Sequence, residues 1–399
     1  MNVLVLNCGS SSMKFQFLEM EKEELKCKGL VERIGANDAI MTYEVQGQDK
    51  LKTVQPIRNH AEALSCCLWL IMSEDRGVIK RKSEIAGIGH RVVHGGEEFS
   101  DSVRIGESVL SRIREFCKFA PLHNPHNLVG IEICQELLPG IPQVAVFDTA
   151  FHHNMPEKSY IYPIPHELYS KYGIRRYGFH GTSHRYVCCR AEEILKTPLS
   201  KLKLITCHLG NGCSIAAVDK GVSVDTTMGY TPLEGLVMGT RCGDIDPAII
   251  LYLLDVQKLS TKEVDTILQK KSGLLGLSGT SNDMREIAAQ AEKGSARHQL
   301  ALDVFCHRIR KYIGAYAAEM GGMDAVIFMG GIGENSKLVR KMVCDNMEFL
   351  GITVDPALNE RNAEIISAGK TKVMVIGTNE ELLIARDTRD IIKGEKSAC

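Results

Sequence analysis

Two similar glycine-rich turns, about half a chain length apart, constrain the fold of this chain more than any other sequence feature. Residues 5–12 (VLNCGSSS) and residues 206–214 (TCHLGNGCS) each read as the end of an apolar strand, a turn of small residues and the start of a returning strand. Small residues permit the positive φ angles that tight hairpins require. One interpretation is a chance similarity between two hairpins. The other is a duplicated domain whose paired turns face one ligand across a cleft.

Strand-like and helix-like patterns alternate along the whole chain, which favours an α/β fold. Apolar residues recur every three or four positions in residues 302–320 and predict a buried helix that ends at Gly321. A second helix is predicted from Ser260, which forms a capping box with Glu263, to near Gly273. Strands are predicted at residues 2–6, 13–18, 85–89, 143–147, 203–208, 214–218, 325–329 and 372–376.

The composition and charge of the chain exclude several classes of protein. Its 399 residues include 48 Lys+Arg and 49 Asp+Glu, and the net charge of −1 argues against nucleic acid or an anionic membrane as the main partner. A hydrophobic content of 44% is typical of a globular protein, here most simply of two domains, and no apolar stretch reaches the ~20 residues that a bilayer requires. The 14 cysteines are scattered without a CxxC motif, so we expect reduced thiols in a cytoplasmic protein.

The two glycine turns are candidates for binding the phosphates of a nucleotide. Backbone N–H groups approach phosphate oxygens only where side chains are small. Asn7, Lys14 and the serines at 10–12 would add donors to the first turn, and residues 208–212 to the second. Neither GxxxxGK[ST] nor a helix-opening GxGxxG occurs, so a nucleotide site here is of another kind. An ordinary hairpin remains the alternative for each turn.

A third glycine-rich segment follows a predicted buried strand. Residues 324–329 (DAVIFM) lead directly into residues 330–336 (GGIGENS), the strand, turn and helix start that often approach a ligand. Gly330, Gly331 and Gly333 lack the Cβ atoms that would block a flat base or a ribose. A tight strand-to-helix turn with no ligand is the alternative.

Two arginines lie among small residues, one in each half of the chain: Arg91 in GHRVVHGG and Arg241 in MGTRCGDIDP. Either could reach into a cleft as a bidentate donor to a carboxylate or phosphate, although a surface salt bridge is the alternative for one arginine alone. His180 is predicted to precede a helix capped near Thr182 or Ser183, where a positive or donor imidazole would meet developing negative charge. Histidine pairs are present, but without HExxH or cysteine partners a zinc site is not favoured.

Acidic residues follow two predicted buried strands. Asp148 comes directly after residues 144–147, and Glu380 and Glu381 follow residues 373–376. Carboxylates at strand ends are common magnesium ligands. The alternative is local: Asn379 as a helix cap, with the two glutamates complementing the helix dipole.

Eight segments, in order along nearly the whole chain, closely resemble the acetate kinase family: LNCGSSSMKF, GHRVVHGG, FDTAFH, YGFHGTSH, HLGNGCS, MGTRCGDIDP, GGIGENS and GTNEEL. The resemblance implies the duplicated ribonuclease H-like fold of actin-like ATPases, whose two halves close on ATP. It implies an N-terminal domain of residues 1–149 completed by a C-terminal helix at about 384–399, and a second domain of residues 150–383. It also implies a homodimer and the reversible reaction of ATP and acetate to ADP and acetyl phosphate.

The resemblance also implies roles for single residues, and no departure from the family pattern occurs at these positions. Arg91 matches the ligand of the acetate carboxylate, and Asp148 matches the catalytic carboxylate. His180 and Arg241 match the pair that stabilises the transition state. The implied metal ligands, for Mg²⁺ or Mn²⁺, are Asn7 and Glu380. The implied pocket for the acetate methyl comprises Val93, Leu122, Phe179 and Pro232. The implied nucleotide-binding residues are Lys14, His208, Leu209, Gly210, Asn211, Gly212, Asp283, Met284, Arg285, Gly331, Ile332, Gly333, Glu334 and Asn335.

The chemistry of such a reaction suits these residues. A carboxylate nucleophile is already anionic at pH 7, so phosphoryl transfer to it needs positioning and charge neutralisation rather than a general base. Asp148 is therefore better interpreted as orienting the metal or an arginine. Two alternatives remain: a propionate or butyrate kinase of the same superfamily, and a non-catalytic actin-like scaffold that binds nucleotide.

Overall fold

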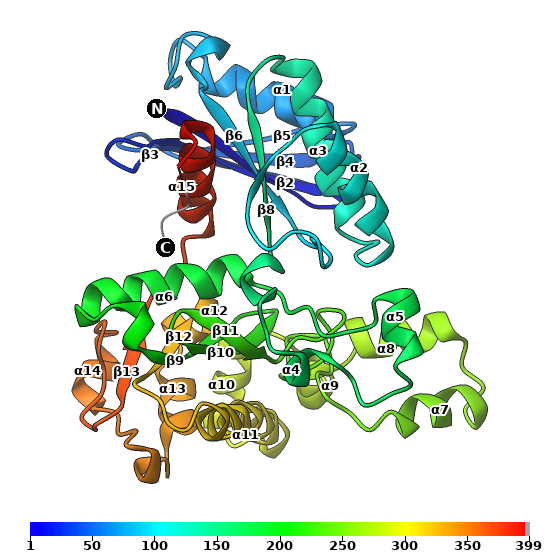
Figure 1. Cartoon of the computed structure of the whole chain (residues 1–399), viewed down its shortest axis with the longest axis vertical. Helices are drawn as coiled ribbons and strands as arrows, with labels where there is room; N and C mark the ends of the chain where they lie inside the picture. The colour runs from blue at the N-terminus through cyan, green and yellow to red at the C-terminus, as the bar shows by residue number, and fades with distance from the viewer. Residues whose placement is uncertain (396–399) are drawn as a thin grey trace. The chain divides into compact units, whose positions relative to one another are not determined.

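The computed structural model describes residues 1–395, and the chain divides into two compact units (Figure 1). Unit 1 comprises Met1–Phe151 together with the C-terminal segment from Asn379, and unit 2 comprises His152–Thr378. Residues 396–399, which belong to the predicted C-terminal helix, lie outside the described part. No helix within residues 1–395 has the length and apolar character needed to cross a membrane.

Unit 1 is built on an eight-stranded sheet in the order β5-β4-β3-β2-β1-β6-β8-β7. Strands β1 to β5 pair antiparallel, whereas β1, β6 and β8 run parallel to one another. The strands are β1 Asn2–Cys8, β2 Ser12–Glu19, β3 Glu24–Glu32, β4 Ala39–Val45, β5 Leu51–Gln55, β6 Gly87–Val92, β7 Val103–Arg104 and β8 Gln143–Phe147. The helices are α1 His60–Ile71, α2 Glu107–Glu115, α3 Asn124–Leu137 and α15 Glu380–Lys393.

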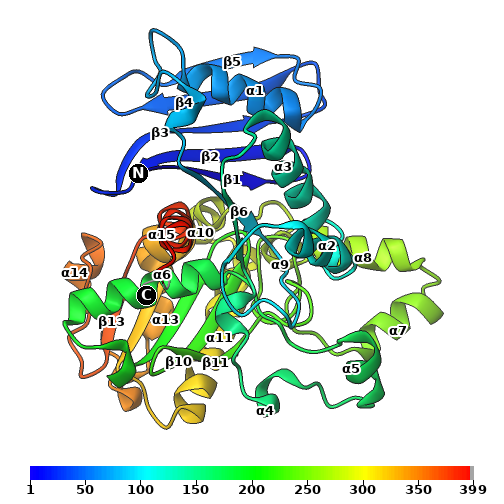
Figure 2. The same ribbon diagram turned by 45° about the horizontal axis from the view of Figure 1, so that its top comes forward.

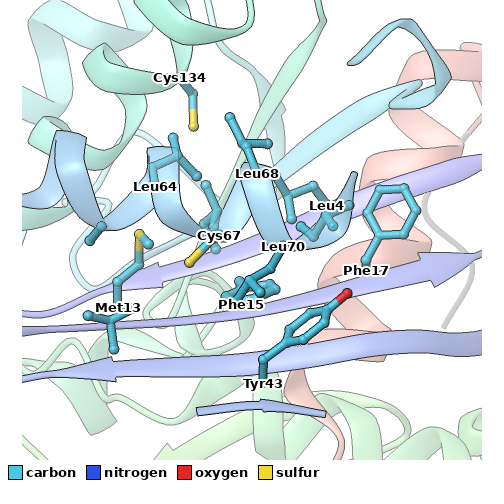
Figure 3. Close-up of a cluster of buried hydrophobic side chains, with 14 of the residues drawn as sticks. Leu4, Met13, Phe15, Phe17, Tyr43, Leu64, Cys67, Leu68, Leu70 and Cys134 are labelled. Atoms are coloured by element: carbon cyan, nitrogen blue, oxygen red, sulfur yellow. The ribbon is translucent and has the colours of Figure 1, made fainter. Parts of the chain in front are cut away.

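Helices cover both faces of this sheet, which explains the continuous apolar run of β1. Leu4 and Leu6 pack in a core with α1, and Figure 3 shows this core with side chains from β1, β2, β4, α1 and α3. Val3 and Val5 point to the opposite face, where they pack with Ile384 of α15. Alternate residues of a strand face opposite sides, so a strand buried on both sides is apolar at every position. The C-terminal helix thus completes the core of unit 1.

Unit 2 repeats the strand pattern of unit 1 in a five-stranded sheet of order β11-β10-β9-β12-β13. Its first three strands pair antiparallel, and β9, β12 and β13 run parallel, as do β1, β6 and β8 in unit 1. The strands are β9 Lys203–Leu209, β10 Cys213–Asp219, β11 Val222–Thr226, β12 Ala325–Met329 and β13 Lys372–Val375. Each glycine turn joins the first two strands of its unit. The duplicated α/β fold is therefore confirmed, and the chance-similarity interpretation is wrong.

The helices of unit 2 lie in part on the sides of its sheet and in part beyond the edge of the sheet (Figure 2). They are α4 Glu157–Tyr160, α5 Glu167–Tyr172, α6 Gly181–Leu195, α7 Ala248–Asp255, α8 Thr261–Lys270, α9 Gly273–Ser278, α10 Met284–Glu292, α11 Ala296–Glu319, α12 Gly330–Asn335, α13 Lys337–Cys344 and α14 Pro356–Glu360. The apolar stripe of α11 is buried as predicted, and Gly321 follows with a φ of +66°. The Ser260 capping box opens α8, but this helix ends at Lys270, because Gly273 starts the next helix.

Candidate active site

An arginine–aspartate pair occupies the ends of two neighbouring strands in unit 1. Arg91 lies near the end of β6 and Asp148 directly follows β8. Nε of Arg91 donates to Oδ1 of Asp148 at 2.9 Å, and Nη2 donates to Oδ2 at 2.6 Å. A guanidinium has five N–H donors. This bidentate pair uses two of them and leaves three on Arg91 for a substrate.

The electrostatic surroundings keep Arg91 fully charged. Burial opposes the charge of its guanidinium, but the carboxylates of Asp148 and Glu380 together raise the pKa of Arg91 above its usual value. Burial raises the pKa of the Asp148 carboxyl, and the Arg91 cation opposes that rise. The structure therefore brings Arg91, Asp148 and Glu380 into one charged cluster at the carboxyl ends of the parallel strands.

Two buried asparagines of α3, which the sequence analysis did not identify, fix the loops around this cluster. Nδ2 of Asn127 donates to the carbonyl of Cys8 at 2.8 Å, and Oδ1 of Asn127 accepts from the backbone N–H of Val93 at 3.1 Å. Asn124 accepts from the backbone N–H of His94 at 3.0 Å and donates to its carbonyl at 2.9 Å. One helix thus holds the end of β1 and the segment that follows β6. The i, i+3 spacing of the two asparagines in the sequence was the available signal.

The start of α15 contains both the helix cap and the first-turn glutamates that the sequence predicts. Oδ1 of Asn379 accepts from the backbone N–H of Leu382 at 3.1 Å, so Asn379 is a helix cap. Glu380 and Glu381 lie in the first turn. Lys14 on β2 forms an ion pair with Glu381 at 2.5 Å and lies opposite Asn7 in the β1–β2 register. The two implied metal ligands, Asn7 and Glu380, therefore belong to segments that this ion pair ties together.

This donor set fits a hard cation. Among the described residues, no group of three or more His, Cys, Asp or Glu side chains converges as a closed metal site. Mg²⁺ usually takes one or two protein oxygens and completes its shell with water and substrate phosphates. An amide oxygen from Asn7 and a carboxylate from Glu380 match that requirement, and a cysteine or histidine cage is not needed.

In unit 2, His180 occupies a strained position at the start of α6. Its φ of 56° and ψ of 23° lie in the left-handed region, which non-glycine residues rarely adopt and which clusters at functional sites. Its ring stacks on that of His208 with centroids 4.1 Å apart, and its Nδ1 lies 2.9 Å from Oγ of Ser214. The prediction that Thr182 or Ser183 caps this helix is wrong, because α6 begins at Gly181 and His180 takes the capping position.

Arg241 lies against the second glycine turn together with His180. A Cβ atom at residue 212 would lie 2.8 Å from Nη2 of Arg241 and 3.3 Å from Nε2 of His180, so Gly212 is needed for this approach. Nη1 of Arg241 donates to the carbonyl of Pro232 at 2.6 Å, and within residues 1–395 the guanidinium forms no ion pair. Burial lowers the pKa of Arg241. A desolvated cation without a carboxylate is a strong electrostatic partner for an anion.

The predicted nucleotide segments of unit 2 line one cavity of about 720 Å³. The predicted residues that contribute to its wall are Gly210, Asn211, Asp283, Met284, Arg285, Gly331, Ile332 and Asn335. Asp283 caps α10 by accepting from the backbone N–H of Arg285 at 2.8 Å, and the two side chains form an ion pair. The cavity also contains Asn282, whose Nδ2 donates to Oδ1 of Asn211 at 3.0 Å. This volume is within the range of small-molecule sites.

Four other predicted nucleotide-binding residues of unit 2 do not line this cavity. Leu209 is a core side chain, and its carbonyl oxygen would lie 2.7 Å from a Cβ atom at Gly330, which has a φ of +75°. Gly333 and Glu334 lie in α12, whose first turn contains the glycines that were expected in a separate turn. Oε1 of Glu334 accepts from the backbone N–H groups of Gly330 and Thr378, each at 3.1 Å. His208 stacks on His180.

Arg340, which the sequence analysis missed, secures the α12 wall of this cavity. Its side chain is fully buried, and Nη1 donates to the carbonyls of Gly333 at 2.9 Å and Glu334 at 2.8 Å. Its Nε donates to Oδ1 of Asn359 at 2.7 Å, and Nη2 donates to the carbonyl of Asn359 at 3.1 Å and to Oδ1 of Asn362 at 2.5 Å. Burial lowers its pKa. A buried cation that satisfies helix-end carbonyls holds the helix end in place.

Replacing Arg340 by methionine is therefore expected to raise KM for the nucleotide and to lower the free energy of unfolding by about 3 kcal/mol, since each buried acceptor left without a donor costs ~1–3 kcal/mol. Arg310 offers a matched control, because its Nε donates to the carbonyl of Val343 at 3.2 Å at the end of α13. Arg310→Met should lose stability without a change in nucleotide KM. Urea unfolding and initial-rate kinetics measure both, and an unchanged nucleotide KM in Arg340→Met would contradict the prediction.

The four residues implied for the acetate methyl pocket differ in exposure. In unit 1, Val93 is buried at 7% exposure and Leu122 is 70% exposed. In unit 2, Phe179 is buried at 2% exposure, and its carbonyl accepts from Nε2 of His152 at 3.1 Å. The carbonyl of Pro232 is the acceptor of Arg241. Val93 is therefore a buried residue two positions after Arg91, Phe179 directly precedes His180, Pro232 contacts Arg241, and Leu122 is at the surface of unit 1.

Comparisons with known proteins agree with the duplicated fold, and they define the chain as a phosphotransferase with a carboxyl group as acceptor. The model of the acetokinase family matches residues 2–386. The chain is 55% identical to the acetate kinase of Alkaliphilus metalliredigens, over 98% of this chain and 100% of the relative. The chain belongs to the acetokinase family.

Two solved structures carry the same fold. A crystal structure of Porphyromonas gingivalis acetate kinase is 45% identical with a TM-score of 0.95, covering 98% of this chain and 99% of the other. A crystal structure of a propionate kinase from Francisella tularensis is 42% identical with a TM-score of 0.92, again covering 98% and 99%. The two structures differ in the acceptor that their names give, so the fold is shared between enzymes for acetate and propionate.

Proposed function

We propose that this protein catalyses the reversible, direct in-line transfer of the γ-phosphoryl group of ATP to acetate, giving ADP and acetyl phosphate. The observation that carries the proposal is the desolvated Arg241 guanidinium, without an ion-pair partner within residues 1–395, which lies with His180 against Gly212 at the second glycine turn. A hydroxamate trap for acyl phosphate, with ATP, Mg²⁺ and acetate, tests it. Absence of acetyl hydroxamate from a folded enzyme would contradict it.

Each cluster has a separate task in this reaction. The three free N–H donors of Arg91 bind the acetate carboxylate, and Asp148 holds the guanidinium in place through the bidentate pair. An attacking acetate oxygen needs no base, because the carboxylate is already ionised at pH 7. Arg241 and His180 stabilise the charge on the transferring phosphoryl group. We also propose that units 1 and 2 correspond to the two predicted actin-like ATPase domains, and that the cavity of unit 2 binds the nucleotide.

We propose Mg²⁺ as the metal, held by Asn7 and Glu380, with Mn²⁺ as a substitute. The bound cation would neutralise charge on the nucleotide phosphates. The ion pair of Lys14 with Glu381 leaves the Lys14 charge beside the first glycine turn, where the proposal assigns it a phosphate contact. Loss of activity on chelation and its recovery with Mg²⁺ test this assignment.

Propionate is the second candidate acceptor, because the propionate kinase structure is 42% identical to the chain. One methylene changes binding by only ~1–3 kcal/mol, so substrate overlap is expected. Parallel hydroxamate assays with acetate, propionate and butyrate rank the acceptors.

Enlarging the proposed methyl pocket is expected to shift this ranking. Val93→Ala removes two methyl groups from a side chain that is 7% exposed, and the space created suits one or two further substrate methylenes. kcat/KM for propionate and butyrate should therefore rise relative to acetate while the ATP parameters stay constant. Val31→Ala, a buried valine on β3, is the matched control for general loss of packing. An unchanged acyl-chain preference in Val93→Ala would contradict the assignment of Val93 to the pocket for the acetate methyl.

We further propose a homodimer in which α7 contributes to the interface. Helix α7 (AIILYLLD) has no buried residue, and Ile249, Leu251 and Tyr252 are 46%, 60% and 52% exposed. Exposed apolar patches of this kind mark association surfaces. Light scattering coupled to size-exclusion chromatography should give twice the 44.1 kDa chain mass, and Leu251→Glu should reduce it.

We place the enzyme in the cytoplasm, on the evidence of its cysteines. Twelve cysteines of the described chain carry free thiols, as expected in a reducing compartment. Cell fractionation followed by an activity assay tests the location.

A further inference from the structure

A chain of hydrogen bonds extends from a buried threonine to His180 in unit 2. Oγ1 of Thr206 lies 2.6 Å from Nδ1 of His184, and Nε2 of His184 lies 2.8 Å from Oγ of Ser214. Oγ of Ser214 in turn lies 2.9 Å from Nδ1 of His180. His180 and His184 are one helical turn apart, and Ser214 lies on β10 opposite His208 of β9. The two histidines therefore belong to one relay.

The protons in this relay have two possible directions. A hydroxyl donates one proton, so Ser214 donates either to His180 or to His184 and accepts from the other. In the first direction, Thr206 donates to Nδ1 of His184, Nε2–H of His184 donates to Ser214, and Ser214 donates to Nδ1 of His180. In the second direction every bond is reversed, and Thr206 becomes an acceptor.

The buried end of the relay selects the first direction. Thr206 is fully buried, and within residues 1–395 its hydroxyl contacts a single hydrogen-bonding group, Nδ1 of His184. If Thr206 accepted from His184, its own proton would be buried without an acceptor, which native structures avoid. His184 is also fully buried, and burial holds its pKa well below the usual value, so it is neutral and carries one proton.

We propose that the relay Thr206–His184–Ser214 holds His180 as the neutral tautomer with its proton on Nε2, so that His180 acts on the transferring phosphoryl group as a hydrogen-bond donor and not as a second cation. Ser214, His184 and Thr206 are then positioning residues that act through His180. The role of His180 on the phosphoryl group rests on the proposed function. The tautomer itself does not, because it is a property of the free enzyme.

The charges around His180 agree with a neutral ring. Arg241 lies with Nε2 of His180 against Gly212, and a second cation there would be repelled by its guanidinium. The titratable groups of unit 2 near this ring include His208, stacked on it at 4.1 Å, and His184, one helical turn away on α6; the buried thiol of Cys213 lies near Arg241. His152, whose ring lies 5.5 Å from that of His184, has its pKa lowered to about 4 by burial.

The test is ¹⁵N NMR of the full-length enzyme with labelled histidines, where His180→Gln assigns the His180 signals. At neutral pH, without substrates, Nε2 should be protonated and Nδ1 unprotonated. In Ser214→Ala and Thr206→Val the tautomer preference should weaken and the pKa of His180 should rise, whereas Ser214→Thr and Thr206→Ser, which retain a hydroxyl, should restore both. A doubly protonated His180, or one protonated on Nδ1, would overturn the proposal.

Ser223→Ala is the matched control, because Oγ of Ser223 lies 2.7 Å from Nδ1 of His152 and so serves a buried histidine outside the relay. It should leave the His180 signals unchanged. In kinetic assays, kcat of Ser214→Ala should fall about tenfold for each pH unit below the raised pKa of His180. Ser223→Ala should keep the wild-type dependence of kcat on pH. If the NMR spectra show His180 protonated on Nε2 but the enzyme forms no acyl phosphate, the proposed function is wrong and the relay stands. If Ser223→Ala shifts the pKa of His180 as much as Ser214→Ala does, the relay is wrong.

Discussion

Arg91→Ala is expected to lower kcat/KM for acetate by about 10²–10³, the effect of removing one charged group that stabilises a reacting anion (~2.7–4 kcal/mol). The loss should include a raised KM for acetate, since the three N–H donors left by the bidentate pair are the ones that we propose bind the carboxylate. Nucleotide affinity should change little, because the cavity that we propose for the nucleotide is lined by residues of unit 2. Initial-rate kinetics and calorimetry with ATP measure the two effects separately.

The same substitution leaves Asp148, a buried carboxylate, without its cation, which is expected to cost ~3–5 kcal/mol of folding free energy. The double variant Arg91→Ala/Asp148→Asn should recover most of that stability and none of the activity. Arg114→Ala, which breaks an exposed ion pair with Glu132, should change neither by more than about 1 kcal/mol. A loss of ATP affinity with an unchanged acetate KM would contradict the assignment of Arg91.

The duplicated fold could be predicted because its signals are local. Each glycine turn lies between two strands that pair with each other, so the sequence pattern and the contact coincide. The sequence pattern does not indicate β3, β4 and β5, on one side of the unit 1 sheet. Strand β3 (ELKCKGLVE) carries charged residues along half of its length, and β5 forms the edge of the sheet with no fully buried residue. Antiparallel strands with a partly solvated face carry too few apolar residues to be recognised by composition.

The charged residues of the site could be predicted for a different reason. Arg91 and Asp148 come at the ends of apolar strands, and the carboxyl ends of parallel neighbours meet at one edge of a sheet. Arg340 and the relay could not be found in this way. The partners of Arg340 are 6 to 22 residues away, and Thr206 and Ser214 are small hydroxyl residues within apolar strands. Their roles depend on which neighbour each hydroxyl faces, and that is fixed only by the packing of α6 on β9 and β10.

Substitutions at His180 and Arg241 are expected to act on the transition state more than on bound substrate. Each alanine variant should lower kcat and kcat/KM by similar factors of about 10²–10³, because we propose that both side chains act on the transferring phosphoryl group rather than bind acetate. Arg241 is desolvated and without an ion-pair partner within residues 1–395, so its charge is available only to an anion that develops or moves beside Gly212. His307→Ala, at an exposed site of α11, is a control that should change neither constant.

Conservative substitutions at Arg241 and His180 should each recover part of the activity that the alanine variants lose. Arg241→Lys keeps a positive charge but loses the planar fork that reaches both the Pro232 carbonyl and the space beside Gly212, so it should recover only part of kcat. His180→Gln keeps an N–H donor without a titratable ring and should recover more activity than His180→Ala, since the proposed role of His180 is that of a neutral donor. A His180→Gln variant no more active than His180→Ala, or an unchanged kcat with a raised KM in either alanine variant, would reassign that residue to substrate binding or to the structure of the α6 start.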